Sequence, residues 1–240
     1  MIRESGLVLR YGEIPYRSAW SGQRALITAR RGGRIPDTIV ILQHPPTYTV
    51  GRSGSHDNIL LSETDRLREG IDLLDVDRGG DATYHGPGQI VVYPIMDLRA
   101  RGGDVHAHLR AIEDIVIRTL NDFGVSGERD SNFTGVWVNG AKIAAIGIKV
   151  SNGITSHGFA LNLEPRLDHW SGIVACGIVN REVTSLARLI GVVPNETAVR
   201  DRLMAHAREV FDREWQIPAK PLEADVIGDL AQFPILNALQ

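Results

Sequence analysis

A single cysteine and three lysines are the side chains in this 240-residue chain with the clearest potential for covalent chemistry. Cys176 is followed by Gly177, which leaves the sulfur and the glycine N–H open to a substrate carbonyl. A nucleophilic thiol needs a base or a cation that holds it as a thiolate. The candidate partners are His85, His157 and Lys142. A lone cysteine is equally typical of a small buried side chain, so the residue types alone leave both interpretations open.

Lys142 stands out among these partners because the chain uses arginine for nearly all its positive charge. Twenty-three of its twenty-six cationic residues are arginines, and only a lysine can lose its proton near neutral pH. Strand alternation predicts that Lys142 shares an apolar face with Ala144 and Ile146, where an ammonium needs a partner or a task. An edge-strand lysine that reaches water fits the pattern as well, and either histidine fits a structural role.

The stretch from Arg78 to Gln89, RGGDATYHGPGQ, is the second feature with chemical potential. Its glycines allow backbone N–H groups to approach a carbonyl, carboxylate or phosphate closely. Polar side chains such as Thr83, Tyr84 and His85 would surround such a ligand. A sharp bend between two strands is the simpler alternative.

Hydrophobic patterning predicts a mixed α/β chain around these residues. Helices are expected over 15–31, 62–70, 105–123, 184–189 and 195–213, and strands over 7–10, 38–42, 48–50, 72–76 and 90–98. Asn139-Gly140 and Asn152-Gly153 predict hairpin turns within an antiparallel meander of 135–139, 141–150 and 154–162. The fold class is therefore α/β of the α+β type, with a mixed, largely antiparallel sheet and flanking helices.

Composition and sequence patterns exclude several classes of protein and several kinds of binding partner. We predict one domain over residues 1–240, with an irregular tail from about residue 218, because no repeat or linker divides the chain. A net charge of −3 without a basic run argues against nucleic acid or an anionic membrane as partner. No secretion signal or 18-residue apolar run is present, which predicts a cytoplasmic protein. One cysteine excludes an internal disulfide and a multi-cysteine metal site.

Five motifs together resemble the lipoyl(octanoyl) transferases of lipoate biosynthesis, in order and in spacing. They are RGG from Arg78, TYHGPGQ from Thr83, KIAAIG from Lys142, HGFALN from His157 and ACGI from Ala175. The motifs lie within Arg78 to Ile178, and similarity is weaker on either side. The resemblance implies a single catalytic α/β domain of the biotin and lipoate protein ligase class.

The resemblance also implies an activity, partners and a set of site residues. A family member moves an octanoyl group from acyl carrier protein, through a cysteine thioester, to a lysine of a lipoyl domain. Carried onto this chain, Cys176 is the nucleophile, and Lys142 lowers the pKa of the thiol and moves the proton. Acceptors would be lipoyl domains of 2-oxo acid dehydrogenase complexes and glycine-cleavage H protein, and the enzyme would act as a monomer. The acyl substrate would contact Arg78, Gly79, Gly80, Asp81, Ala82, Thr83, Tyr84, His85, Ala145, Ile146, Gly147, Gly158, Phe159 and Ala160.

Within that set we expect Tyr84, Ile146 and Phe159 to wall an apolar acyl pocket. We expect no ATP and no metal, because thioester exchange is nearly isoenergetic and aminolysis to an amide is downhill. Three alternatives remain. An ATP-dependent lipoate or biotin protein ligase would share the fold but depend on adenylation, a thioesterase would pass the acyl group to water, and a silent binding module would keep the pocket without turnover.

Overall fold

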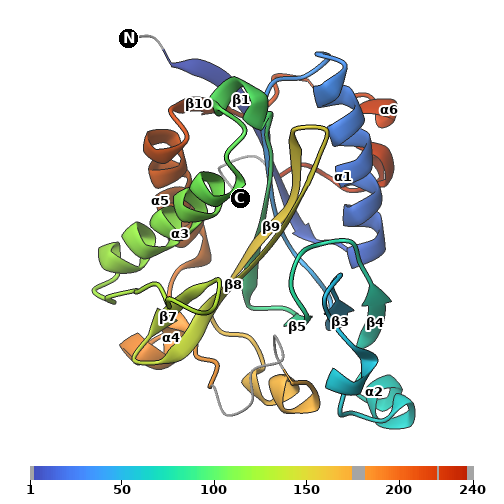
Figure 1. Ribbon diagram of the computed structural model, residues 1–240, viewed down its shortest axis with the longest axis vertical. Coiled ribbons are helices and arrows are strands. Elements are labelled where there is room, and N and C mark those ends of the chain that lie inside the picture. Colours follow the sequence, from blue (N-terminus) through green and yellow to red (C-terminus); the bar gives the residue numbers. More distant parts are fainter. Residues whose placement is uncertain (1–2, 175–181, 221, 237–240) are drawn as a thin grey trace.

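Two sheets organise the protein, a computed structural model of which describes residues 3–174, 182–220 and 222–236. The larger sheet has the order β10-β1-β2-β6-β9-β8-β7 and the smaller one the order β4-β3-β5 (Figure 1). In the larger sheet β1 pairs in parallel with β2 and β10, and the other neighbours are antiparallel. The predicted fold class, mixed and largely antiparallel, is confirmed. The strands are β1 (Glu4–Glu13), β2 (Thr38–Gln43), β3 (Thr47–Val50), β4 (Asp72–Asp75), β5 (Ala82–His85), β6 (Gln89–Ile95), β7 (Val136–Val138), β8 (Ala141–Ser151), β9 (Ile154–Asn162) and β10 (Arg213–Gln216).

Helices cover both faces of the larger sheet (Figure 1). Helix α1 (Tyr16–Arg31) lies on one face, over a core that includes Leu26, Val91 and Tyr93. Helices α3 (Val105–Asp122) and α5 (Glu196–Val210) lie on the other face, over the largest core cluster. The shorter helices are α2 (Glu63–Arg68), α4 (Leu186–Ile190) and α6 (Ala224–Ile227), and the 3₁₀ turns include η1 (His56–Asn58), η2 (Leu98–Arg101), η3 (Leu167–Gly172) and η5 (Gly228–Gln232).

Capping and turn residues set these boundaries as the sequence indicates. Asp104 accepts the N–H of Ala107 at the start of α3, and Asn195 accepts that of Ala198 at the start of α5. Both hairpin turns of the meander place Asn and Gly at positive φ, 51° and 79° in the first and 50° and 81° in the second. Two such residues are what a tight type I′ turn requires, so the predicted meander is confirmed.

Two features differ from the sequence-based expectation. The glycine-rich stretch contains strand β5, which pairs with β3 to form the smaller sheet. The tail is not irregular throughout, because α6 and η5 fold back onto α1 and bury Val226, Ile227 and Leu230. Both depend on long-range packing that local patterning does not reveal.

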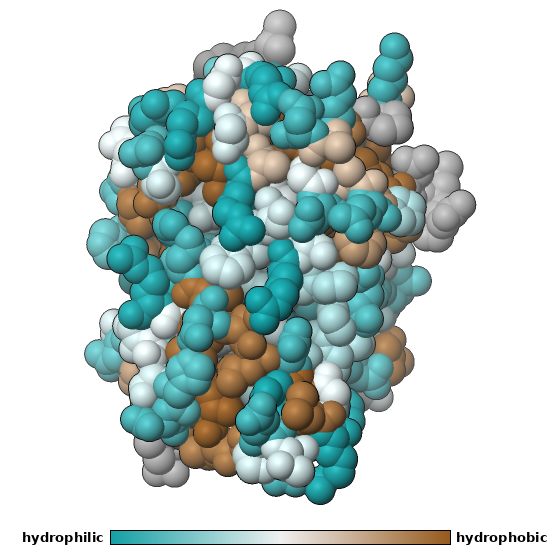
Figure 2. Space-filling model, turned by 90° about the vertical axis from the view of Figure 1, so that its right-hand side faces the viewer, coloured by the Kyte–Doolittle hydropathy of each residue, from teal (hydrophilic) through white to brown (hydrophobic). Residues whose placement is uncertain are grey.

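The side of the molecule that carries α1 and the smaller sheet has an uneven surface. Apolar side chains gather in its lower half, and hydrophilic ones cover most of the remainder (Figure 2). Leu60 and Leu67, beside and within α2, are 60% and 62% exposed. Among the described residues no helix is both long enough and apolar enough to cross a membrane.

Candidate active site

A pocket lies between the α1-side face of the larger sheet and the segment from Arg78 to His85. Its floor comes from three neighbouring strands, since Ala145 pairs with Ala160 across β8 and β9, and Ala160 pairs with Val91 of β6. The lining residues are Tyr16, Arg78, Gly79, Gly80, Asp81, Thr83, His85, Val91, Tyr93, Ala145, Ile146, Gly147, His157, Gly158, Phe159 and Ala160.

Twelve of the fourteen substrate-contact residues predicted from the sequence line this pocket, and Ala82 and Tyr84 do not. Alternation along β5 directs Thr83 and His85 toward the pocket and the other two away from it. Tyr84 packs instead with Tyr48, and its hydroxyl contacts the His169 ring at 2.8 Å. The expectation that Tyr84 walls the pocket therefore does not fit this geometry, whereas Ile146 and Phe159 do line it.

Glycines in the floor let backbone segments approach one another. A Cβ on Gly158 would lie 2.1 Å from the Val92 carbonyl oxygen, and one on Gly147 would lie 2.9 Å from that of Gly79. The Gly79 N–H donates to the Ile148 carbonyl at 2.9 Å, which fastens the glycine-rich segment onto β8. Gly147 and Gly158 therefore serve close packing of the pocket walls as well as leaving space inside it.

Arg78 brings a buried guanidinium to the pocket wall. It donates to the Thr49 carbonyl and hydroxyl oxygens, both at 2.8 Å, and to the Gly79 carbonyl at 3.0 Å. These bonds tie β3 of the smaller sheet to the glycine-rich segment. Arg78 thus fixes the shape of the wall and places positive charge beside any bound carbonyl.

Two pocket histidines are held neutral. Burial, helped by His44 and the Arg78 guanidinium, lowers the pKa of His85 well below its usual value. His85 Nδ1 donates to Gln89 Oε1 at 2.9 Å. Burial also lowers the pKa of His157, against the opposing effect of Asp77, whose carboxylate accepts from Nε2 at 2.7 Å. His157 and Lys149 together lower the pKa of the Asp77 carboxyl.

Tyr16, Asp77, Val91, Tyr93 and His157 reach the pocket or its edge but are missing from the predicted contact set. Only His157 was singled out, as a candidate partner of the thiol. Its positive φ of 56° aims the side chain toward α1, where the Tyr16 hydroxyl lies 3.4 Å from Nδ1. Alternation with Val91 could have indicated Tyr93, but no local signal connects Tyr16 at the start of α1 to this site.

Lys142 is buried near the start of β8, just after the Asn139-Gly140 turn, and does not line the pocket. Its register is irregular: Trp137 lies opposite Lys142, but Val136 lies opposite Ala144, so Ile143 is an extra residue in β8. Such a β-bulge interrupts alternation, and Ile143 and Ala144 both enter the core under α3 and α5. Lys142 therefore faces the other side, and the prediction that it shares a face with Ala144 and Ile146 is wrong.

Cys176 lies outside the described residues, but the chain on either side of it is anchored at the site. Before it, the Val174 N–H donates to the Asn58 carbonyl at 2.8 Å, and the Asn58 side chain donates to Asp81 of the pocket at 2.6 Å. After it, Glu182 accepts from the Lys142 N–H, and Lys142 accepts from the Thr184 N–H, both at 2.9 Å.

A further polar chain joins the pocket to this second anchor. Gln89, which accepts from His85, donates to Asn162 at 2.9 Å, and Asn162 donates to the Thr184 carbonyl at 2.9 Å.

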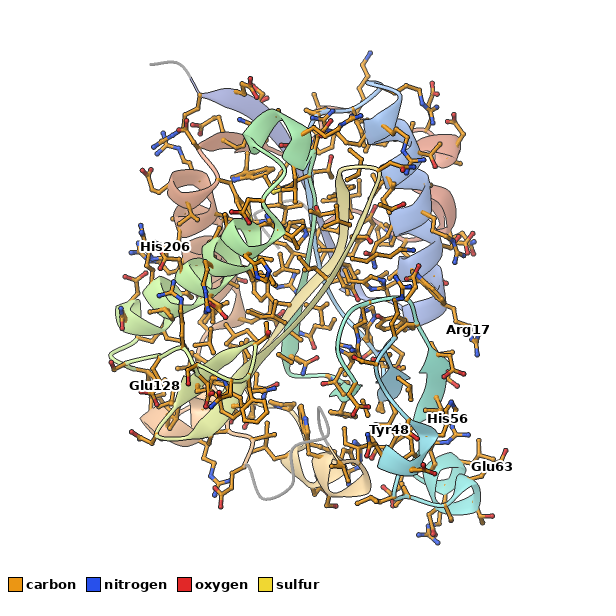
Figure 3. The ribbon with its side chains drawn as sticks, in the orientation of Figure 1. Arg17, Tyr48, His56, Glu63, Glu128 and His206 are labelled. Carbon is orange, nitrogen blue, oxygen red and sulfur yellow. The ribbon has the colours of Figure 1, made fainter. Side chains whose placement is uncertain are left out.

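Tyr48, labelled in Figure 3, lies beside η3 and donates to the His169 carbonyl at 2.5 Å. Among the described residues no group of three or more His, Cys, Asp or Glu side chains could hold a metal ion.

Comparison with known proteins relates the site to a family. The model of the lipoyl protein ligase A/B catalytic domain matches residues 15–208. The chain is 46% identical over 211 residues to the octanoyltransferase of Chloroflexus aurantiacus, which covers 87% of this chain and 95% of that protein. A lipoate-protein ligase A solved with ATP bound superimposes with a TM-score of 0.78 at 16% identity, over 95% of this chain and 94% of that one. The biotin protein ligase of Aquifex aeolicus superimposes with a TM-score of 0.52 at 10% identity, over 87% of this chain and 69% of that one.

Proposed function

The chain belongs to the lipoyl protein ligase A/B catalytic domain family, and on that premise we propose how its site carries out octanoyl transfer. Its relatives, alike over most of both chains, are named octanoyltransferases, so the protein is an acyltransferase that transfers octanoyl groups in protein lipoylation. The two ligases compared above share its fold at 16% and 10% identity, which supports the architecture alone.

We propose a two-step transfer through Cys176. The thiolate attacks the carbonyl of an octanoyl thioester on acyl carrier protein, the new S–C bond replaces the old one, and the carrier leaves as a thiolate that takes the proton of the Lys142 ammonium. A lysine amine of a lipoyl domain then attacks the Cys176 thioester, the S–C bond breaks, and an amide forms. Lys142 favours the thiolate as a cation and accepts the incoming amine's proton when neutral.

The observation that supports this assignment best is the double anchoring around Cys176. One flank is bonded through Asn58 to Asp81 at the pocket rim, and the other is bonded to the backbone of Lys142. Ala145 follows Lys142 by three residues on β8, about 10 Å along the strand, and begins the pocket floor. An acyl chain on Cys176 could thus extend from Lys142 into the apolar part of the pocket, between Ile146, Phe159 and Ala160.

The test is the intact mass of the enzyme after incubation with octanoyl acyl carrier protein. Wild type should gain one octanoyl group that hydroxylamine removes, and Cys176→Ser should gain none, because a nearby cation does not ionise a hydroxyl near neutral pH. Addition of a lipoyl domain should yield amide-linked product without ATP or magnesium. Normal amide formation by Cys176→Ser would refute the covalent route, a requirement for ATP would favour the ligase chemistry, and free octanoate as the product would favour a thioesterase.

A further inference from the structure

The ammonium of Lys142 lies over an aromatic ring. Its Nζ is 4.7 Å from the centroid of the Trp137 ring, inside the range of about 6 Å in which a cation is attracted to an aromatic face. Lys142 is 8% exposed and Trp137 1% exposed. The pair is therefore largely shielded from water, and such contacts are stronger than those at exposed sites.

The strand pairing holds the ring in place. Trp137 lies directly opposite Lys142 in the β7–β8 ladder, just before the bulge at Ile143. Its own N–H donates to the Glu128 carbonyl at 2.9 Å, and the Glu128 N–H donates back to the Trp137 carbonyl at 2.8 Å. Glu128, labelled in Figure 3, lies beside β7 at the end of the sheet. Both backbone polar groups of Trp137 are thus bonded to Glu128, on the edge of β7 away from β8, and its indole N–H also points to the Phe133 carbonyl at 3.4 Å.

Gly135 confines the stem of the same lysine. A Cβ on Gly135 would lie 3.4 Å from Lys142 Cε and 3.7 Å from Cδ, so the methylenes pass directly over this glycine. Its φ of 136° is a conformation that side chains rarely adopt. The stem therefore crosses Gly135 before the ammonium reaches the ring, which fixes the direction of the side chain.

The ring and an ordinary apolar wall have opposite effects on a buried lysine. Burial alone penalises the ammonium, whereas the negative face of an indole ring attracts the ammonium and not the neutral amine. The β-bulge removes Lys142 from the apolar core and places it on this ring. The first step proposed above requires a cation near the Cys176 thiol.

We propose that Trp137 is a positioning residue that holds the Lys142 ammonium in place through a cation–π contact. This inference rests on the proposed roles of Lys142 and Cys176. The chain has one cysteine, so the ultraviolet absorbance of its thiolate reports Cys176 as the pH is raised, below the pH at which the five tyrosines begin to ionise. Trp137→Leu should reduce the thiolate fraction at neutral pH about tenfold, which corresponds to about 1.4 kcal/mol and lies within the range for a cation–π contact. Trp137→Phe keeps an aromatic face and should retain most of the wild-type thiolate.

A second measurement leaves the packing undisturbed, because removal of a fully buried indole could unfold the chain. Biosynthetic replacement of tryptophan by mono- and difluorinated analogues weakens the negative ring face with little change of shape. The thiolate fraction and the alkaline limb of the pH–rate profile should shift stepwise with the number of fluorines. Trp137→Phe labelled in the same way is the matched control, since it carries the analogues only at Trp20, Trp170 and Trp215 and should not respond.

The variant Lys142→Ala distinguishes a failure of the proposed cysteine–lysine pair from a failure of the proposed role of Trp137. If this variant titrates its thiol as wild type does, the proposed cysteine–lysine pair is wrong. If Lys142→Ala loses thiolate but the fluorinated series keeps the wild-type titration and pH–rate profile, the pair stands and the role of Trp137 is overturned. A stepwise shift that disappears in labelled Trp137→Phe supports the inference.

Discussion

Three histidines near the pocket are kept neutral by burial. Burial lowers the pKa of His44 from 6.5 to about 4, and it lowers those of His85 and His157 in the same direction. His44 Nδ1 donates to the Ile14 carbonyl at 2.7 Å, so Nε2 accepts from the Tyr93 hydroxyl at 2.6 Å. Between pH 6.5 and about 4 the unfolded chain therefore binds more protons than the folded one, and acid favours unfolding.

We predict that the free energy of unfolding falls as the pH is lowered from 7 to 4. His44 alone should contribute on the order of 3 kcal/mol, because its pKa falls from 6.5 to about 4 and each pKa unit corresponds to about 1.4 kcal/mol. Urea unfolding at a series of pH values measures the change. His44→Gln should show a shallower dependence, with the remainder due to the other groups whose pKa values are lowered, among them His85, His157 and Asp77. Equal pH dependence in wild type and His44→Gln would contradict this account.

At the level of strands and helices, the sequence predicts those features that depend on residues close together along the chain. Caps such as Asp104 and the two Asn-Gly turns set their elements within a few residues. The face of Lys142 was predicted wrongly, because the bulge at Ile143 comes from strand pairing and has no signature in residue types. For the same reason Tyr16, which reaches the pocket only through packing of α1 on the sheet, could not be identified.

For the segment around Cys176, the sequence and the structure provide different information. The motifs identified Cys176 and Lys142 by resemblance, and the structure adds only that Val174 and Glu182 are bonded to Asn58 and Lys142. Residue types could not indicate these bonds, since all four groups involved in them are backbone N–H or carbonyl groups, which nearly every residue carries.

The floor strands determine which side chains can limit the acyl chain. Gly147 is a poor place to fill the pocket, because a valine there would press on the Gly79 carbonyl and the Arg78 side chain. Ala145 is the better position: it lines the pocket, is only partly buried and faces Ala160 across the ladder. We predict that Ala145→Leu shifts preference from octanoyl toward hexanoyl about tenfold, because two methylenes at about 0.8 kcal/mol each lose their space.

Relative transfer of hexanoyl, octanoyl and decanoyl groups from acyl carrier protein measures this shift. Ala198→Leu adds the same carbons at an exposed position of α5 and should transfer all three chains in wild-type proportions. Wild-type proportions in a folded Ala145→Leu variant would place the acyl chain outside this pocket.

For the molecule as a whole, α1 connects the tail to the pocket. Tyr16 at its first position lines the pocket, and Gly22 further along lies against Leu230 of the tail, where a Cβ on the glycine would approach Leu230 Cγ to 2.4 Å. Leu230 is fully buried in the core beneath α1. The tail therefore belongs to the core that holds α1 against the sheet.

We predict that Leu230→Ala lowers the free energy of unfolding by about 2–5 kcal/mol, the usual cost of a leucine-sized cavity. Turnover per folded molecule should remain near wild type, since Leu230 touches α1 away from Tyr16. Leu67→Ala is the matched control, because the same atoms are removed from a side chain that is 62% exposed, and its stability should change by less than about 0.5 kcal/mol. Chemical denaturation together with octanoyl transfer at a temperature where both variants are folded tests the two parts. Equal stability of the two variants would mean that the tail does not support α1, and a selective loss of turnover in folded Leu230→Ala would mean that the tail also shapes the pocket through α1.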